Sequence, residues 1–328
     1  MHSLSACSRC ESSPGRFLQK VGSRDHRNPP IGQPGDRLKA AQPVVVVLVA
    51  YRSSLTPLEQ IAVDRCFNVL GRHPMVVVAP DGVALPSPLD RLPVERFSPS
   101  CFSGVSAYNS LMLSPDFYRR FLSYRYLLLH QLDVFVFRDE LLDWCSRGYD
   151  YIGAPWIGEE WPGREETRQG LPFWIRSRLF RFLPRLRHDV GNGGFSLRKV
   201  QSMYRAVSWL RRTKRAWGGR NEDGFFSIAV PECWWWAGYR VPTAEEAMRF
   251  SVETQPSACL AKMEGRVPFA CHGWDKHEPA FWHPLLAELG YDFDLEAACR
   301  LEAARLSRRH TKQEARRLEL EREAHARA

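Results

Sequence analysis

The sequence contains no apolar run long enough to cross a lipid bilayer. Its longest such run, Val44–Tyr51, is far too short for a membrane helix. No uninterrupted apolar segment stands near the N-terminus, so no targeting sequence is expected. Internal repeats are also absent, which argues against a solenoid or a propeller. These absences predict a soluble, cytoplasmic protein that is at most peripheral to a membrane.

A disulfide framework is missing as well. The nine cysteines are odd in number and have no regular spacing, which fits reduced thiols in a cytoplasmic setting. Cys7 and Cys10 have the CxxC spacing of a zinc-ligand pair, but no second pair follows at the distance that a zinc finger requires. We interpret these two residues as free thiols.

What the sequence does contain is typical of a globular protein. Its 328 residues are 44% hydrophobic and 12% aromatic, enough to bury a large core. The net charge of +9 favours phosphorylated ligands, anionic glycans or an acidic membrane surface as partners. Nucleic acid fits the same charge, but no motif supports it, so it is not expected as a partner.

The chain divides into three segments by composition. Residues 1–42 are rich in Ser, Pro, Gly and Arg without a hydrophobic period, which indicates a disordered segment. Residues 43–294 carry alternating strand and helix patterns and are predicted to form the functional domain. Residues 295–328 are charged and free of Gly and Pro, which predicts a C-terminal helix.

The beginning of the central segment predicts a βαβ unit. Val44–Tyr51 is a continuous β-branched run, as in a strand buried on both faces of a parallel sheet. Thr56 caps a helix with Pro57 at its first position, and a second buried strand follows at Met75–Ala79. Further helices are expected at 106–112, 114–121, 138–145, 199–212 and 243–250. Further strands are expected at 126–137 and 149–154.

A long insertion interrupts this pattern at residues 158–189. Within it, residues 173–187 alternate aromatic and basic side chains. Such a segment suits contact with an anionic membrane or a polyanionic acceptor, and it suits a solvated helix face equally well.

A carboxylate, Asp133, interrupts the apolar run 126–137 near its end. The carboxyl edge of an α/β sheet is where ligands bind, and a carboxylate buried among apolar side chains requires a cation or hydrogen-bond donors. Mg²⁺ or Mn²⁺ bridging a diphosphate would supply that charge, because hard cations prefer oxygen ligands. The alternative is a carboxylate that caps a nearby helix or loop.

A glycine-rich turn with polar side chains beside it comprises Gly191, Asn192, Gly193, Gly194, Ser196 and Arg198. Glycines allow backbone N–H groups to approach a ligand closely. The spacing matches neither the GxGxxG fingerprint nor the P-loop. The turn is a candidate binding segment, and a plain tight turn is the alternative.

Two adjacent acids, Glu222 and Asp223, precede a pair of phenylalanines at a predicted helix start. A carboxylate against an apolar wall has a raised proton affinity, which suits a general base. Asp223 is the favoured candidate of the two. The alternative is that both acids simply complement the helix dipole.

The last candidate, His272, stands beside a Gly-Trp pair late in the domain. A neutral imidazole completes a metal site or contacts a diphosphate, whereas a purely structural histidine is the alternative. Trp156, Trp161 and Trp274 have side chains suited to stacking on sugar or base faces, and core or loop packing is the alternative.

Together these segments resemble a mostly bacterial domain family of unknown function related to GT-A glycosyltransferases. The similarity runs from about Val44 to Phe293 and is carried by YNSLMLSPDFYRRF, YLLLHQLDVFVF, YDYIGAPW, VGNGGFSLR, NEDGFF and FACHGW. It implies a GT-A-like, Rossmann-like α/β sandwich of the nucleotide-diphospho-sugar transferases, with a mixed central sheet and a C-terminal helix.

The resemblance also implies roles for single residues. Gln131 and Asp133 stand where such transferases usually have Asp-x-Asp, so Asp133 with His272 would hold a divalent cation, Mn²⁺ or Mg²⁺. This metal site is expected to differ from the usual one, because Gln131 replaces the first acid. Asp223, with Glu222 beside it, matches the base of inverting members.

By the same resemblance, the glycine-rich turn, Gln131 and Trp274 would line the pocket for donor and acceptor. We therefore predict a glycosyltransferase that moves a sugar from a nucleotide-sugar donor to a glycan or lipid-linked acceptor, in polysaccharide or glycoconjugate biosynthesis. The alternative is a non-catalytic module that binds a carbohydrate or a nucleotide sugar, which the neutral Gln131 favours.

Overall fold

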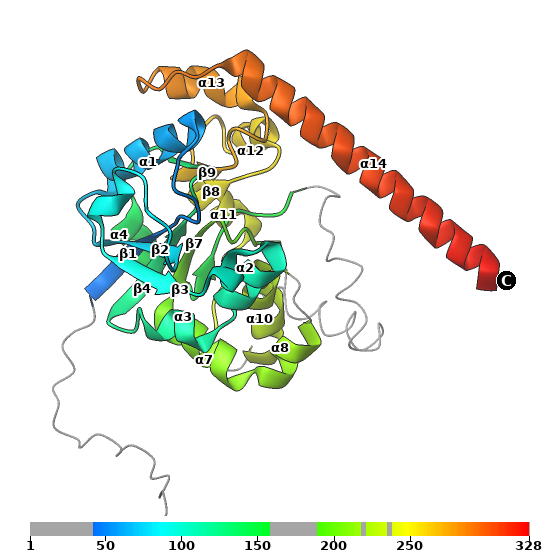
Figure 1. Ribbon diagram of the computed structural model, residues 1–328, viewed down its shortest axis with the longest axis horizontal. Coiled ribbons are helices and arrows are strands. Elements are labelled where there is room, and N and C mark those ends of the chain that lie inside the picture. Colours follow the sequence, from blue (N-terminus) through cyan, green and yellow to red (C-terminus); the bar gives the residue numbers. More distant parts are fainter. Residues whose placement is uncertain (1–41, 158–188, 218–220, 235–237, 328) are drawn as a thin grey trace, which may run out of the picture. The chain divides into compact units, whose positions relative to one another are not determined.

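The core of the structure is a six-stranded sheet with helices on both faces (Figure 1). A computed structural model describes residues 42–157, 189–217, 221–234 and 238–327. The strands lie in the order β3-β2-β1-β4-β7-β6. They are β1 (Gln42–Val49), β2 (Met75–Pro80), β3 (Val94–Phe97), β4 (Tyr124–His130), β6 (Tyr151–Ile152) and β7 (Phe195–Lys199).

Some of the sequence predictions concern residues outside the described ranges. These are the disordered segment expected at 1–42, apart from Gln42, the aromatic and basic segment 173–187, and the side chains of Cys7, Cys10 and Trp161. Every cysteine in the described part of the chain is a free thiol.

The six-stranded sheet is mixed, as predicted. Strands β1 to β4 are parallel where they pair, whereas β7 runs antiparallel to both β4 and β6. The chain passes from β1 to β2 on one side, and β4 lies on the other side of β1. The strand order therefore reverses between β1 and β4, and ligands of open α/β sheets bind at such a point, beyond the carboxyl ends of the strands.

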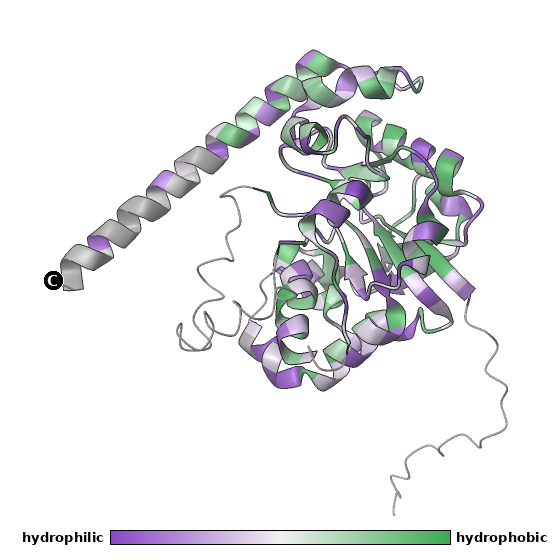
Figure 2. Cartoon of the chain, turned by 180° about the vertical axis from the view of Figure 1, so that it is seen from behind, coloured by the Kyte–Doolittle hydropathy of each residue, from purple (hydrophilic) through white to green (hydrophobic). Residues whose placement is uncertain are grey.

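Alternate residues of β1 face two different hydrophobic clusters, which confirms the strand buried on both faces. Val44, Val46 and Leu48 pack on the side of α1 (Pro57–Leu70) and α4 (Leu141–Ser146). Val45 and Val47 pack on the side of α3 (Pro115–Arg119) and α7 (Val200–Trp209). In Figure 2, hydrophobic colouring accordingly marks the central strands.

A second sheet of three strands, in the order β5-β9-β8, corrects one prediction. Its strands are β5 (Val134–Val136), β8 (Ser251–Val252) and β9 (Ala270–His272). The single strand predicted over 126–137 is wrong, because the chain leaves the large sheet after His130 and joins the small one at Val134. Gln131 and Asp133 are polar, so the segment between the two strands turns to the pocket side instead of continuing through the core.

The remaining helices are α2 (Val105–Met112), α8 (Arg211–Trp217), α9 (Glu222–Gly224), α10 (Val230–Trp234), α11 (Ala244–Phe250), α12 (Pro256–Lys262), α13 (Pro279–Ala287) and α14 (Leu295–Arg327). Short 3-10 turns occupy Leu89–Arg91 and Pro99–Phe102, and a π-helix occupies Phe225–Ala229. The helix predicted over 199–212 is two helices, because Leu210 leaves the helical conformation at φ −85° and ψ 44°.

The predicted helix starts and the C-terminal helix are confirmed. Thr56 makes a capping box with Glu59, and the Thr243 side chain accepts a hydrogen bond from the Glu246 backbone N–H. The C-terminal helix is α14, at the start of which the predicted domain boundary falls. Among the described helices, none has the length and apolar character needed to cross a membrane.

Candidate functional site

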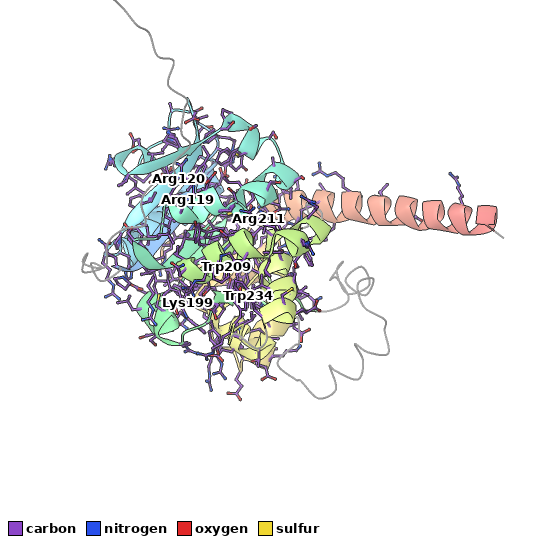
Figure 3. The ribbon with its side chains drawn as sticks, turned by 90° about the horizontal axis from the view of Figure 1, so that it is seen from below. Arg119, Arg120, Lys199, Trp209, Arg211 and Trp234 are labelled. Carbon is purple, nitrogen blue, oxygen red and sulfur yellow. The ribbon has the colours of Figure 1, made fainter. Side chains whose placement is uncertain are left out.

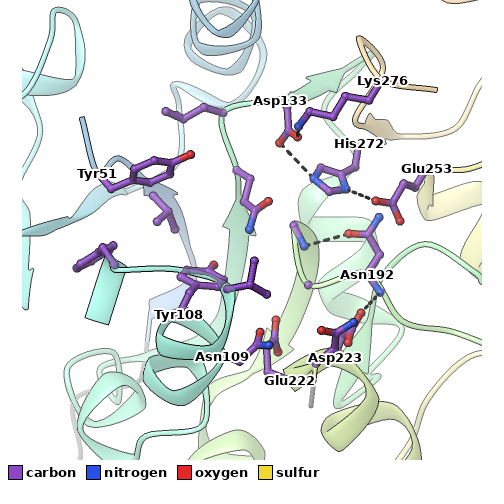
Figure 4. A pocket seen from close by; sticks show the side chains of 18 of the residues that line it. Tyr51, Tyr108, Asn109, Asp133, Asn192, Glu222, Asp223, Glu253, His272 and Lys276 are labelled. Atoms are coloured by element: carbon purple, nitrogen blue, oxygen red, sulfur yellow. Dashed lines mark hydrogen bonds and ion pairs between the residues drawn. The ribbon is translucent and has the colours of Figure 1, made fainter. Parts of the chain in front are cut away.

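A pocket of about 890 Å³ opens at the carboxyl ends of β1 and β4, where the strand order reverses. Its walls come from the segments after these two strands, from α2, from the glycine-rich turn before β7, from α9 and from the loop after β9. Figure 4 shows acidic side chains on two sides of this space, with Asp133 in one group and Glu222 and Asp223 in the other.

The glycine-rich turn lets these groups come together. A Cβ atom at Gly193 would lie 1.9 Å from Oε1 of Glu222, and one at Gly194 would lie 2.3 Å from Nε2 of His272. Neither distance is compatible with a side chain, so the two glycines allow Glu222 and His272 to approach the backbone of the turn. Asn192, which precedes these two glycines, takes the left-handed conformation, at φ 61°.

Asp223 is held by the same turn. Its Oδ2 accepts a hydrogen bond from the Asn192 backbone N–H at 2.9 Å, and its Oδ1 accepts one from the Gly224 N–H at 2.7 Å. Burial and the adjacent Glu222 carboxylate raise the pKa of Asp223 to about 7, against the opposing effect of these two donors. Asp223 is therefore a carboxyl group that takes up and releases a proton near neutral pH.

Glu222 is anchored from behind by a buried arginine. Arg198 is fully buried and donates from Nη2 to Oε1 of Glu222 at 2.9 Å. Its other donors reach the Tyr118 hydroxyl and Oγ of Ser196, both at 2.9 Å. Arg198 and Ser196 thus support the pocket wall, and they do not belong to its lining.

Polar atoms in this wall remain without a protein partner. Oε2 of Glu222 and Nδ2 of Asn192 are buried and have no hydrogen-bond partner among the described residues. Buried polar groups are almost always paired, so an unpaired acceptor and donor beside a pocket point to a polar ligand that completes them. A hydroxyl-rich molecule meets both needs, because a hydroxyl donates and accepts.

On the other side of the pocket, Asp133 is surrounded by cationic groups. Its Oδ1 lies 3.1 Å from Nε2 of His272, and its Oδ2 forms an ion pair with Lys276 (Figure 4). Nδ1 of His272 lies 3.1 Å from Oε1 of Glu253, so the imidazole sits between two carboxylates. Strand pairing in the small sheet explains this arrangement. Val134, which directly follows Asp133, pairs with His272 where β5 lies beside β9.

These neighbours fix the charges of the cluster. Burial alone would raise the pKa of Asp133, but His272 and Lys276 outweigh it and hold that pKa well below its usual range. Burial opposes protonation of His272, yet Asp133 and Glu253 raise its pKa to about 10. Burial opposes the charge of Lys276, yet Asp133 and Asp275 together outweigh it and raise the pKa of Lys276.

The expected divalent cation does not fit this set of donors. One oxygen of Asp133 faces His272 and the other binds Lys276, while Gln131 offers only a neutral amide. Both ring nitrogens of His272 face carboxylates, Nε2 that of Asp133 and Nδ1 that of Glu253, so neither nitrogen points to an open position for a metal. In the ranges that the structure describes, no three His, Cys, Asp or Glu side chains are grouped to hold a metal ion.

The structure brings most of the predicted site residues to the pocket, and those that line it are Gln131, Asp133, Trp156, Asn192, Gly193, Gly194, Glu222, Asp223 and His272. Gly191 lies outside the lining, against Trp156, whose ring would be 1.8 Å from a Cβ at this glycine. Trp274 is fully buried and packs against Phe135 and Phe293, which corresponds to the core-packing alternative.

The sequence reasoning missed several lining residues, namely Tyr51, Arg52, Tyr108, Asn109, Glu253, Asp275 and Lys276. For Lys276 a signal was present, because it follows His272 by four residues in the segment HGWDK. Glu253 directly follows the two-residue strand β8, which the sequence pattern did not reveal.

A basic and aromatic surface lies on α7, α8 and neighbouring segments (Figure 3). Trp209 is 70% exposed, and its ring lies 6.2 Å from that of Trp234. Arg205 stands 5.9 Å from the Trp209 ring, in cation–π range. None of these three residues lines the pocket.

The fold and pocket define a mixed α/β protein with a carboxylate-rich site at the switch point of its sheet. Residues 91–272 match the family described as "Protein of unknown function (DUF5672)", and the chain belongs to this family. The domain of unknown function expected from the sequence is thereby confirmed. That the family is mostly bacterial stays a prediction. A search of curated proteins finds no match.

Solved structures with a similar chain path include two glycosyltransferases. Mouse xyloside xylosyltransferase 1, in its apo form, has a TM-score of 0.39 and 13% identity, covering 71% of this chain and 97% of that chain. The galactosyltransferase LgtC, in complex with donor and acceptor sugar analogues, has a TM-score of 0.43 and 10% identity, covering 79% and 95%. At these scores no residue role is transferred from either protein.

Proposed function

We propose that this protein is a glycosyltransferase of the GT-A type, with the pocket at the carboxyl ends of β1 and β4 as its active site. The observation that carries the proposal is Asp223, a pocket-lining carboxyl group with a pKa of about 7. A general base works best when its pKa is near the working pH. Asp223 has this property beside a wall whose unpaired polar atoms suit a sugar.

In the proposed reaction, Asp223 accepts the proton of an acceptor hydroxyl. The hydroxyl oxygen forms a bond to the anomeric carbon of a nucleotide sugar, while the bond from that carbon to the phosphate oxygen breaks. The electron pair of the broken bond leaves with the nucleoside diphosphate, and the configuration at the anomeric carbon inverts. Glu222, through its unpaired Oε2, orients a sugar hydroxyl.

The substrates belong to this proposal in their class only: a nucleotide-sugar donor and a glycan or lipid-linked acceptor. Peripheral contact with an anionic membrane and a cytoplasmic location stay predictions from the sequence. So does the divalent cation, Mn²⁺ or Mg²⁺, to which no step is assigned because the donors at Asp133 do not suit it.

The test is incubation of the purified protein with a panel of nucleotide sugars, with release of nucleoside diphosphate as the readout. Release above the spontaneous rate, lost in Asp223→Asn, supports the proposal. Asp90→Asn, a change at an exposed acid away from the pocket, is the matched control. Release that is equal in wild type and Asp223→Asn would contradict the role of Asp223.

A second candidate is a non-catalytic module that binds a carbohydrate or a nucleotide sugar. Gln131 favours it, because a neutral amide lies where the resemblance leads one to expect an acid. Calorimetry with intact nucleotide sugars separates the two functions. Saturable binding of a nucleotide sugar that is recovered unchanged after prolonged incubation supports the module.

A further inference from the structure

The pocket needs positive charge if a diphosphate is to enter it. Its acidic lining residues are Glu59, Asp133, Glu222, Asp223, Glu253 and Asp275. The lysine and arginine side chains that line it, within the described residues, are Arg52 and Lys276. Arg52 is already paired with Glu59, on the first turn of α1. Lys276 stands at Asp133, at the end of β4 where the resemblance places the diphosphate.

Building on the proposed function, we infer that the Lys276 ammonium binds the diphosphate of the donor in the place of a divalent cation, and that Asp133 positions it. A divalent cation held by protein requires more than one anionic oxygen ligand in most sites. Here one carboxylate, Asp133, stands beside one neutral amide, Gln131, and its two oxygens already face His272 and Lys276. Lys276 supplies positive charge from the protein itself.

The backbone holds Lys276 in place. The Gly273 N–H donates to the carbonyl oxygen of Asp133 at 2.9 Å, and the Lys276 N–H donates to the carbonyl oxygen of Gly273 at 2.8 Å. Gly273 takes the left-handed conformation, at φ 61°, which closes this turn over Asp133. The lysine is therefore attached to the backbone next to the carboxylate that its side chain binds.

The ammonium group also remains accessible to a ligand. The Lys276 side chain is 44% exposed, whereas that of Asp133 is 14% exposed. An ammonium has three N–H donors, and the pairing with Asp133 leaves others for phosphate oxygens. In the proposed reaction this charge stabilises the negative charge that develops on the leaving diphosphate.

The experiment is calorimetric titration with ADP, CDP, GDP, TDP and UDP, each in EDTA and in Mn²⁺. We expect at least one of them to bind in EDTA, with a Kd that Mn²⁺ changes by no more than about twofold. Lys276→Gln weakens this binding by about tenfold or more, the effect of losing a charged hydrogen bond. Lys276→Arg keeps most of it, and Lys262→Gln, at an exposed lysine of α12, leaves it unchanged.

Asp133→Asn separates the lysine from a metal. It removes the carboxylate that positions the ammonium and leaves the ammonium itself, so binding in EDTA is expected to weaken by less than in Lys276→Gln. The melting temperature of each variant without ligand shows whether it is folded, and Lys276→Met, which also removes the charge, replaces Lys276→Gln if that variant is unfolded.

Each contrary result has one meaning. Binding that requires Mn²⁺, or binding in EDTA that neither Lys276→Gln nor Lys276→Arg alters, overturns the role of Lys276 and leaves the proposed transferase intact. Absence of binding by all five nucleotides in both buffers overturns the proposed function, and the inference with it.

Discussion

Two aspartates, the buried Asp223 and the partly buried Asp133, lie on opposite sides of one pocket and have opposite acid–base properties. Asp133, at the small sheet, has its pKa held below the usual range by His272 and Lys276. Asp223, at the glycine-rich turn, has its pKa raised to about 7 by burial and by Glu222. Both side chains are largely removed from water, so burial does not distinguish them.

The difference teaches that the nearest charges decide what a buried carboxyl group does. Asp133 has cations on both oxygens, stays ionised and suits the holding of positive charge. Asp223 has an acid beside it and only backbone N–H donors on its oxygens, so its proton is exchangeable. The Asp133 side of the pocket suits the binding of positive charge, and the Asp223 side suits proton transfer.

The largest effect is expected from exchanging Asp223 for Asn. The amide keeps only one of the two accepting oxygens and takes no proton, so turnover falls by about 10²–10⁴-fold, the usual contribution of a general base. The affinity for nucleoside diphosphate stays within about threefold, because Asp223 lies on the other side of the pocket. Turnover and calorimetry on the same preparation check both halves, and a parallel loss of affinity would break the comparison.

The next effect concerns Arg198, which neutralises the acid beside Asp223. Arg198→Met leaves Glu222 buried with an unpaired charge, and we expect a loss of about 3–5 kcal/mol in the free energy of unfolding. Urea denaturation followed by tryptophan fluorescence measures it. The double variant Arg198→Met/Glu222→Gln recovers part of the loss, since it removes the unpaired charge.

Arg119→Met is the matched control for this prediction. Arg119 pairs with Asp116 on the surface, where the two side chains are 59% and 69% exposed (Figure 3). Solvent screens an exposed ion pair, so Arg119→Met is expected to leave the unfolding curve nearly unchanged. Equal losses at Arg198 and Arg119 would show that burial is not what makes the Arg198–Glu222 pair important.

A third effect is the pH profile of turnover at low substrate concentration. Since Asp223 acts as a base, turnover falls about tenfold per pH unit below its pKa of about 7 and levels off above it. Nucleotide binding, which depends on the Asp133 side, is expected to be flat between pH 6 and 8. A rate plateau that extends down to pH 5 would mean that Asp223 has an ordinary aspartate pKa.

The smallest effect is on stability, and the two aspartates contribute with opposite sign. The pKa of Asp223 is higher in the folded state than in the unfolded chain, so its contribution to stability is lost as pH rises from about 4 to 7. The pKa of Asp133 is lower in the folded state, so its contribution is present above about pH 4 and lost below it.

At pH 8, then, Asp223→Asn is expected to raise the melting temperature and Asp133→Asn to lower it. The changes are on the order of 1 kcal/mol, or roughly 2–4 °C for a domain of this size. Melting curves at pH 5 and pH 8 measure them, and the gain of Asp223→Asn shrinks at the lower pH. Shifts of the same sign at pH 8 would remove the distinction between the two carboxyl groups.

Strands β1 and β2 of the large sheet could be predicted from the sequence because they are continuous apolar runs, whereas β3 and β7 were not predicted. A continuous apolar run of this length is typical of a strand buried on both faces. The structure confirms such a strand within Val44–Tyr51 and at Met75–Ala79. The small sheet could not be predicted. Its strands β8 and β9 have two and three residues, too few for a periodic pattern to appear.

The same contrast holds for the site. The glycine-rich turn and the Glu222–Asp223 pair are local signals, and both line the pocket. The pairing of Asp133 with Lys276 joins residues 143 positions apart, through the register of β5 with β9. Such a contact depends on tertiary structure, so the sequence pattern did not reveal that Lys276 stands at Asp133.

The π-helix that follows the two acids, Phe225–Ala229, has a consequence for how this protein changes by insertion and deletion. A π-turn holds one residue more than an α-turn, and each residue of an α-helix turns the chain by about 100°. Loss of one residue here would regularise the helix while rotating Glu222 and Asp223 away from their partners. Deletion of a single codon in this stretch would thus leave a chain that folds but whose Glu222 and Asp223 no longer face the pocket.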